Sequence, residues 1–151
     1  MRLVKISRGQ RRWEVLGIAT DAGNCQVLDF LFDQIQGKLI PEDDNSSFES
    51  ACTQMLAWLR EEIPTNGPPT REPASAPLGD GLMELRKNRK GKKLRVSWFY
   101  DGQRIIVCVL AFSKRSKRET TPPDAVARSK KLMRRYFTDK AQGQNRIDPI
   151  R

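Results

Sequence analysis

Three strand-like runs follow one another in the second half of the chain and restrict its possible folds more than any other feature. The runs are Gly81–Arg86, Leu94–Tyr100 and Gln103–Phe112. Residues 88–92 suit a hairpin loop, and Asp101-Gly102 is a strong signal for a two-residue hairpin turn. Strands joined by such short turns pair antiparallel. This part of the chain therefore predicts an antiparallel three-stranded meander.

The turn at Asp101-Gly102 also predicts a register. If Tyr100 faces Gln103, then Val96 lies opposite Val107 and Arg95 lies opposite Cys108. The core face then collects Leu94, Val96, Trp98, Tyr100, Ile105, Val107 and Val109, together with Met83 and Leu85. The second face is half basic and half apolar, and its charged members are Glu84, Arg86, Arg95 and Lys114.

The remaining segments complete a mixed fold. We expect a first strand at 12–20, a helix at 27–37, a helix that begins near Asn45 or Ser46 and stops before Pro64, and a last helix from Thr121. This order predicts an α/β (α+β) protein with a small, mainly antiparallel twisted sheet. The two N-terminal helices cover one face, and the basic C-terminal helix is available to cover the apolar half of the other.

A chain of 151 residues suits a single domain. We place that domain at residues 1–137. Residues 64–77 hold five of the nine prolines and are expected to form an irregular loop within it. Residues 138–151 are polar and are expected to form a frayed C-terminal tail.

Positive charge is concentrated in one region of the chain. The formal net charge is +10, yet residues 86–137 carry 17 Lys and Arg against 3 Asp and Glu. The first 77 residues carry 8 Lys and Arg against 11 Asp and Glu and are slightly acidic. A basic region of this kind is typical of a protein that binds a polyphosphate, usually nucleic acid.

Several classes of protein are disfavoured by composition. The chain has no His, and its three Cys form no CxxC pair, so we expect no metal site and no cofactor. The first residues lack the apolar core of a signal peptide, and the longest apolar run, Ile105–Phe112, is too short to span a membrane. We expect a cytoplasmic protein with reduced thiols and no membrane partner.

An ordered set of short motifs resembles the RelE/HigB-type toxins, in particular the phage-derived branch of the RelE/ParE superfamily. The motifs are Trp13-Glu-Val15, Val27-Leu-Asp-Phe-Leu31, Asn66-Gly-Pro-Pro69, Leu78-Gly-Asp-Gly-Leu-Met-Glu-Leu-Arg86, Arg95 in its strand, Phe112-Ser-Lys-Arg115, and Pro122 before a basic helix. The resemblance covers residues 13–137. It implies a RelE-like fold and a toxin that cleaves translated messenger RNA in the ribosomal A site and inhibits growth, without a metal.

The resemblance also implies partners and catalytic positions. The partners are a cognate helix-turn-helix antitoxin, the ribosome and mRNA. Arg95 matches a catalytic Arg of the meander strand, Lys114 and Arg115 match a basic pair after the last strand, and Arg86 ends the Leu-Arg strand. The sequence departs from the RelE pattern at two positions. Glu84 stands where that branch has Lys, and Thr121 stands where it has a catalytic Tyr.

Cleavage of RNA through its own 2′-OH requires a base, an acid and positive charge at the phosphorane. Arg86, Arg95 and Arg115 can supply the charge. Lys114, Lys117 and Glu84 are the candidates for proton transfer, although Glu84 also suits a simple ion pair. Basic side chains that could bind RNA are Lys92, Lys93, Lys117, Arg118, Arg128 and Lys131. Two alternatives stay open: a non-catalytic RNA- or ribosome-binding translation inhibitor, and a ParE-like gyrase inhibitor.

Overall fold

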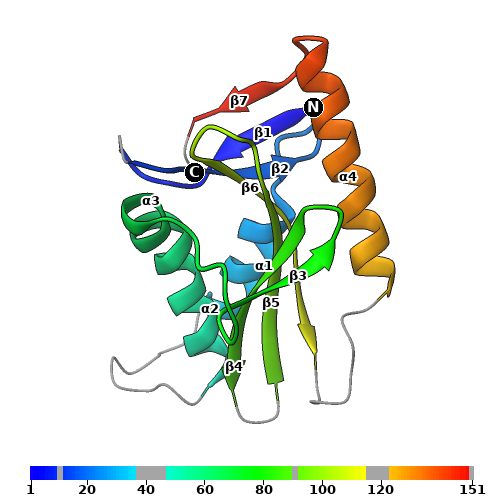
Figure 1. Cartoon of the computed structure of the whole chain (residues 1–151). Coiled ribbons are helices and arrows are strands. Elements are labelled where there is room, and N and C mark those ends of the chain that lie inside the picture. Colours follow the sequence, from blue (N-terminus) through cyan, green and yellow to red (C-terminus); the bar gives the residue numbers. More distant parts are fainter. Residues whose placement is uncertain (10–11, 37–46, 90–91, 115–122, 150–151) are drawn as a thin grey trace.

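The computed structural model describes residues 1–9, 12–36, 47–89, 92–114 and 123–149. Within these ranges the chain forms one sheet of seven strands with helices on both faces (Figure 1). In sheet order the strands are β3 (Ser75–Gly79), β4 (Leu82–Arg89), β5 (Lys92–Tyr100), β6 (Ile105–Lys114), β2 (Glu14–Ala19), β1 (Arg2–Lys5) and β7 (Arg146–Asp148). The helical segments are α1 (Gln26–Ile35), α2 (Phe48–Ala57), η1 (Trp58–Glu62), α3 (Ile63–Asn66) and α4 (Pro123–Ala141).

The α+β class is confirmed, but the sheet is larger than expected and is mixed rather than simply antiparallel. β3, β4, β5 and β6 pair antiparallel in sequence order. β2 then pairs parallel with β6, and β7 pairs parallel with β1. The sheet is therefore mixed. β2 lies beside β6, so β1 and β2 extend the sheet at the edge of the meander. The chain between β2 and β6 contains the helical segments and β3, β4 and β5, which is ample for the crossover that a parallel pair needs.

Each face of the sheet has its own apolar core. The cluster under α1 and α2 contains Leu28, Leu31, Met55, Val96 and Trp98. The cluster on the other face is closed by Met133 and Tyr136 of α4 and contains Phe99 and Val107. The C-terminal helix thus covers the apolar half of the second face, as the sequence predicts. Figure 1 shows α4 running along one side of the sheet.

The register of the first hairpin agrees with the sequence pattern. Leu85 pairs with Val96 and Arg86 pairs with Arg95 across β4 and β5. Leu85 and Val96 lie in the core beneath α1 and α2. Glu84, Arg86 and Arg95 consequently share the opposite face, because side chains alternate along a strand.

The predicted register between β5 and β6 is wrong. Tyr100 pairs with Ile106 and Phe99 with Val107, so β6 is displaced by three residues from the expected position. The connection is longer than a two-residue turn, because the Asp101 N–H donates to the Ile105 carbonyl at 2.8 Å. The buried Asp101 carboxylate accepts hydrogen bonds from Tyr136 and Lys140 of α4. The Asp101 side chain therefore anchors the helix, and its backbone begins a connection that is longer than the expected two-residue turn.

A β-bulge in β6 adds a second departure from the expected register. Trp98 pairs with Cys108, but Val96 pairs with Ala111, so Val109 and Leu110 together oppose Ser97. The displacement by three residues places each side chain in the first half of β6 on the face opposite to the predicted one. The extra residue of the bulge returns the side chains after it to their predicted faces. Lys114 therefore pairs with Lys93 and shares the face of Arg95. The predicted face of Lys114 is correct only because the displacement and the bulge, neither of which was predicted, have opposite effects on it.

The expected helix stop before Pro64 is also wrong. The chain stays helical from Phe48 to Asn66, passing through the wider turn η1 and then α3. Pro64 lies at the start of α3, directly after the wider turn η1, where the helical hydrogen-bond pattern changes. Its carbonyl accepts from the Trp13 N–H at 2.9 Å. The expected N-cap residues Asn45 and Ser46 lie outside the described residues, and Ser47 caps α2.

The proline-rich stretch and the C-terminal stretch are more regular than expected. The 64–77 loop shrinks, because α3 ends at Asn66 and β3 begins at Ser75. In the 138–151 segment, α4 continues to Ala141 and β7 pairs with β1. Arg2 of β1 also forms an ion pair with Asp148 of β7. Across the described ranges, no helix combines the length and apolar character required to cross a membrane.

Candidate nucleic-acid interface

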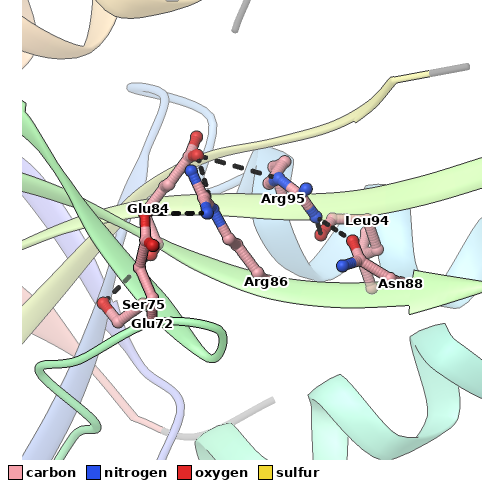
Figure 2. Close-up of polar contacts among 7 residues, drawn as sticks. All are labelled: Glu72, Ser75, Glu84, Arg86, Asn88, Leu94 and Arg95. Carbon is pink, nitrogen blue, oxygen red and sulfur yellow. Dashed lines mark hydrogen bonds and ion pairs between the residues drawn. The ribbon is translucent and has the colours of Figure 1, made fainter. Parts of the chain in front are cut away.

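A buried carboxylate, Glu84, lies at the centre of the charged part of the α4 face. It has no exposed surface. Glu84 Oε1 is 3.0 Å from Arg86 Nε and 3.7 Å from Arg95 Nε. Figure 2 shows both guanidinium groups directed at this carboxylate from neighbouring positions of β4 and β5. Such ion pairing compensates for the cost of burying the carboxylate.

Arg95 lies beneath the surface rather than on it. Its exposed fraction is 3%, and its Nη1 donates to Asn88 Oδ1 and to the Leu94 carbonyl, both at 2.9 Å. Burial lowers the pKa of Arg95, whereas Glu84 raises it. The guanidinium keeps its proton at any physiological pH. Within the described residues, Arg95 Nε makes no hydrogen bond, so one N–H donor of this buried guanidinium is unsatisfied.

Lys114 adds an amine to the same cluster from the end of β6. Its exposed fraction is 6%, and it lies across from Lys93 of β5. Burial lowers the pKa of Lys114; Glu84 opposes this shift, and Arg95, Arg86 and Lys93 reinforce it. A lysine in such a setting is easier to deprotonate than one in water. Lys114 therefore suits proton transfer better than an exposed lysine would.

Arg86 is the member of the cluster that solvent reaches most readily. Its side chain is 26% exposed, and Glu72 Oε1 lies 3.5 Å from its Nη1 on the outer side. The Glu72 side chain is 73% exposed, so this second pair is weak. An incoming anion could displace Glu72 and meet the outer edge of the Arg86 guanidinium.

Most of the predicted RNA-binding residues that the structure describes lie away from this cluster. Lys93 joins it, but Lys92 points to the opposite face, where its Nζ lies 4.9 Å from the Phe48 ring centroid. Arg128 lines a separate cavity of about 340 Å³ between α4 and the β1–β2–β6 part of the sheet. Lys131 is exposed on α4. Arg115, Lys117, Arg118 and Thr121 lie outside the described residues.

Two residues that support the cluster were missed by sequence reasoning. Asn88 accepts the Arg95 hydrogen bond, and Ser75 donates its hydroxyl to the Glu84 carbonyl at 3.0 Å (Figure 2). Asn88 continues the alternation of Glu84 and Arg86, which is a usable signal once β4 is extended to Arg89. Ser75 comes from a proline-rich stretch that carries no strand signal.

The arrangement suits the binding of an anion. Three cations, Arg86, Arg95 and Lys114, surround one carboxylate, so the cluster keeps a positive excess. The described part of the chain contains no group of three or more His, Cys, Asp or Glu side chains placed to hold a metal ion. The protein is thus a small α+β protein with a cationic cluster on one face of its sheet.

Comparison with known protein families assigns this protein to one of them. The family model described as Phage derived protein Gp49-like (DUF891) matches residues 44–134, which is more than half of the chain and includes the whole cluster. The chain belongs to this family, which is associated with toxins of toxin–antitoxin systems. A search of curated proteins gives no match.

Proposed function

We propose that this protein is the toxin of a toxin–antitoxin system and a ribosome-dependent endoribonuclease. The observation that carries the proposal is the cluster of Arg86, Arg95 and Lys114 around buried Glu84 on one face of the meander. Family membership and the motif resemblance support the toxin assignment. Ribosomes and translated mRNA, and hence the cytoplasm, are then the site of action.

The burial of each group suggests its role. Arg86 contacts the scissile phosphate, because it is the most exposed cation of the three. Lys114 takes the proton from the 2′-OH in its neutral form, which its lowered pKa makes more accessible. Glu84 and Arg95 are positioning residues: Glu84 holds Arg86, and Arg95 adds fixed positive charge from below.

The proposed reaction is an internal transfer. The 2′ oxygen attacks phosphorus as its proton passes to Lys114 Nζ, and the bond from phosphorus to the 5′ oxygen breaks. The 5′ oxygen takes up a proton from solvent or from Lys117, which lies outside the described residues. The products are a 2′,3′-cyclic phosphate and a 5′-OH. A ribosome-bound message is already ordered by its host, which reduces what the protein must contribute.

Lys114 makes this mechanism testable through its pH dependence. The cleavage rate should rise with pH while Lys114 is mostly protonated and level off above its lowered pKa, below the ordinary lysine value of 10.5. Lys114→Met should cut about a hundredfold or more slowly, because general-base catalysis typically contributes 10²–10⁴-fold. The measurement is single-turnover cleavage of a ribosome-bound message at a series of pH values.

Lys131→Ala is the matched control for that experiment. Lys131 is exposed on α4, so its loss should weaken ribosome binding slightly and in a salt-dependent manner, with the pH profile unchanged. If Lys114→Met and the parent share one rate and one pH profile, Lys114 is not the base.

One observation favours a second function, a non-catalytic RNA- or ribosome-binding inhibitor of translation. Lys114 and Glu84 are 6% and 0% exposed, and catalytic groups must reach substrate. Under this alternative the cluster would organise a binding surface around Arg86. Translation would then stop without any cut in the message.

The family association and the charge distribution also lead us to propose a cognate antitoxin. The motif resemblance implies a helix-turn-helix protein. An excess of 14 positive charges over residues 86–137 favours a partner that presents acidic side chains to that region.

A further inference from the structure

The face on which Lys114 lies depends on the single extra residue in β6. Before the bulge, Ile106 and Cys108 point to the α1–α2 side, with Trp98. After it, Phe112 and Lys114 point to the Arg95 side, opposite Arg95 and Lys93. If Val109 and Leu110 did not share one partner, alternation would place Lys114 on the α1–α2 side instead.

A buried pair of serines holds the bulge from the α4 side. Ser97 Oγ accepts the Leu110 N–H at 3.0 Å and lies 2.8 Å from Ser129 Oγ of α4. Both serines are fully buried. Without the Ser97 hydroxyl, the Leu110 N–H would lose this partner, and a buried unpaired donor is unfavourable.

Gln26 holds the bulge from the opposite edge of β6. The ladder between β2 and β6 ends at the pair Gly17–Cys108. Beyond it, Gln26 Nε2 donates to the Ala111 carbonyl at 2.8 Å, and Gln26 Oε1 accepts the Ala111 N–H at 2.7 Å. The side-chain amide therefore pairs with Ala111 as a neighbouring strand would, directly after the two bulged residues.

We propose that Gln26, Ser97 and Ser129 are positioning residues, which fix the bulge at Val109–Leu110 and thereby deliver Lys114 to the Glu84–Arg95 cluster. Three elements converge on the bulge: the start of α1, the middle of β5 and the first half of α4. Gln26, Ser97 and Ser129 are uncharged, and in this role they act through the backbone of β6 rather than by contact with RNA. The assignment rests on the proposed function only where it gives Lys114 a role in cleavage.

The test compares two double variants of the full chain. Gln26→Met with Ser97→Ala removes both anchors while keeping similar side-chain volume. Gln36→Met with Ser113→Ala is the control. Both of these side chains are exposed, and Ser113 lies on β6, the strand that contains the bulge. Carbon-13-labelled lysine and NMR report the pKa of Lys114, with Lys114→Arg to assign its signal. Single-turnover cleavage of a ribosome-bound message reports the rate and the affinity separately.

Loss of the anchors should move the pKa of Lys114 toward 10.5, its ordinary value, because the amine leaves its buried site and the positive charges of Arg95, Arg86 and Lys93. The cleavage rate at saturating ribosome should fall at least tenfold, with ribosome affinity within about twofold of the parent. The control should match the parent in both respects. Gln26→Glu, which keeps the acceptor for the Ala111 N–H, should lie between the parent and Gln26→Met.

Two results would overturn the proposal. One is a folded double variant whose Lys114 pKa equals that of the parent. The other is a control variant that shifts as far as the double variant does. If the double variant does not fold, Gln26→Met alone decides, since the Gln26 side chain is on the surface. The NMR arm decides the positioning claim even if the parent does not cut RNA, so the two proposals fail separately.

Discussion

Replacing Glu84 with leucine should lower the free energy of unfolding by about 3–5 kcal/mol, because it leaves a buried guanidinium without its carboxylate. Glu84 has no exposed surface, and Arg95 is 3% exposed. After the substitution, Arg95 would still donate to the Asn88 amide oxygen and to the Leu94 carbonyl, which are neutral acceptors. Removing one partner of a buried pair is costly even where the pair itself adds little stability.

Urea denaturation of parent, Glu84→Leu and Glu84→Gln measures this effect. Glu84→Gln should fall between the other two, since it keeps an acceptor oxygen and the volume but not the charge. Glu72→Gln is the matched control, because Glu72 also pairs with Arg86 but is 73% exposed. It should change stability by less than about 1 kcal/mol. Equal stability of Glu84→Leu and the parent would show that the carboxylate does not compensate Arg95.

Arg86→Ala should slow cleavage about a hundredfold or more, the usual cost of one group that stabilises charge in the transition state. Arg86 is the cation of the cluster that solvent and RNA can reach, and Glu84 holds its Nε at 3.0 Å. The loss should appear in the rate at saturating ribosome rather than in ribosome affinity, because the phosphorane carries more negative charge than the ground state.

Arg89→Ala is the control for this substitution. Arg89 belongs to the same strand but to the opposite face, where it bonds to Gln54 of α2. It should retain near-parental cleavage. Circular dichroism melting of both variants separates folding from chemistry. Equal slowing by Arg86→Ala and Arg89→Ala would mean that the chain responds to lost charge in general, not to a site.

The first hairpin could be predicted from sequence because its pattern is local. Met83, Leu85, Val96 and Trp98 alternate with charged or small residues, and only one face of each strand suits the core. That alternation alone brings Glu84, Arg86 and Arg95 together. The sequence alone therefore predicts that Glu84, Arg86 and Arg95 share one site.

The β5–β6 register could not be predicted, because its determinants are remote in sequence. Asp101 resembles a turn residue, but its carboxylate serves Tyr136 and Lys140 of α4. β6 is apolar on both faces, so its hydrophobic pattern cannot indicate either a three-residue displacement or a bulge. The bulge depends on Gln26, which lies 85 residues away from Ala111 in sequence. The burial of Arg95 follows from its contacts with Glu84 and Asn88 of β4 rather than from its own position in an alternating strand.

Ribosome-dependent cleavage is tested most directly by mapping the 5′ ends of cellular messages after brief induction of the parent and of Lys114→Met. With the parent, new ends should appear inside translated codons and depend on ongoing translation, whereas Lys114→Met should give few or none. Arrested translation without new ends would contradict cleavage and favour the binding inhibitor. Growth arrest with DNA-damage signalling and intact messages would contradict it too, and would place the target at gyrase.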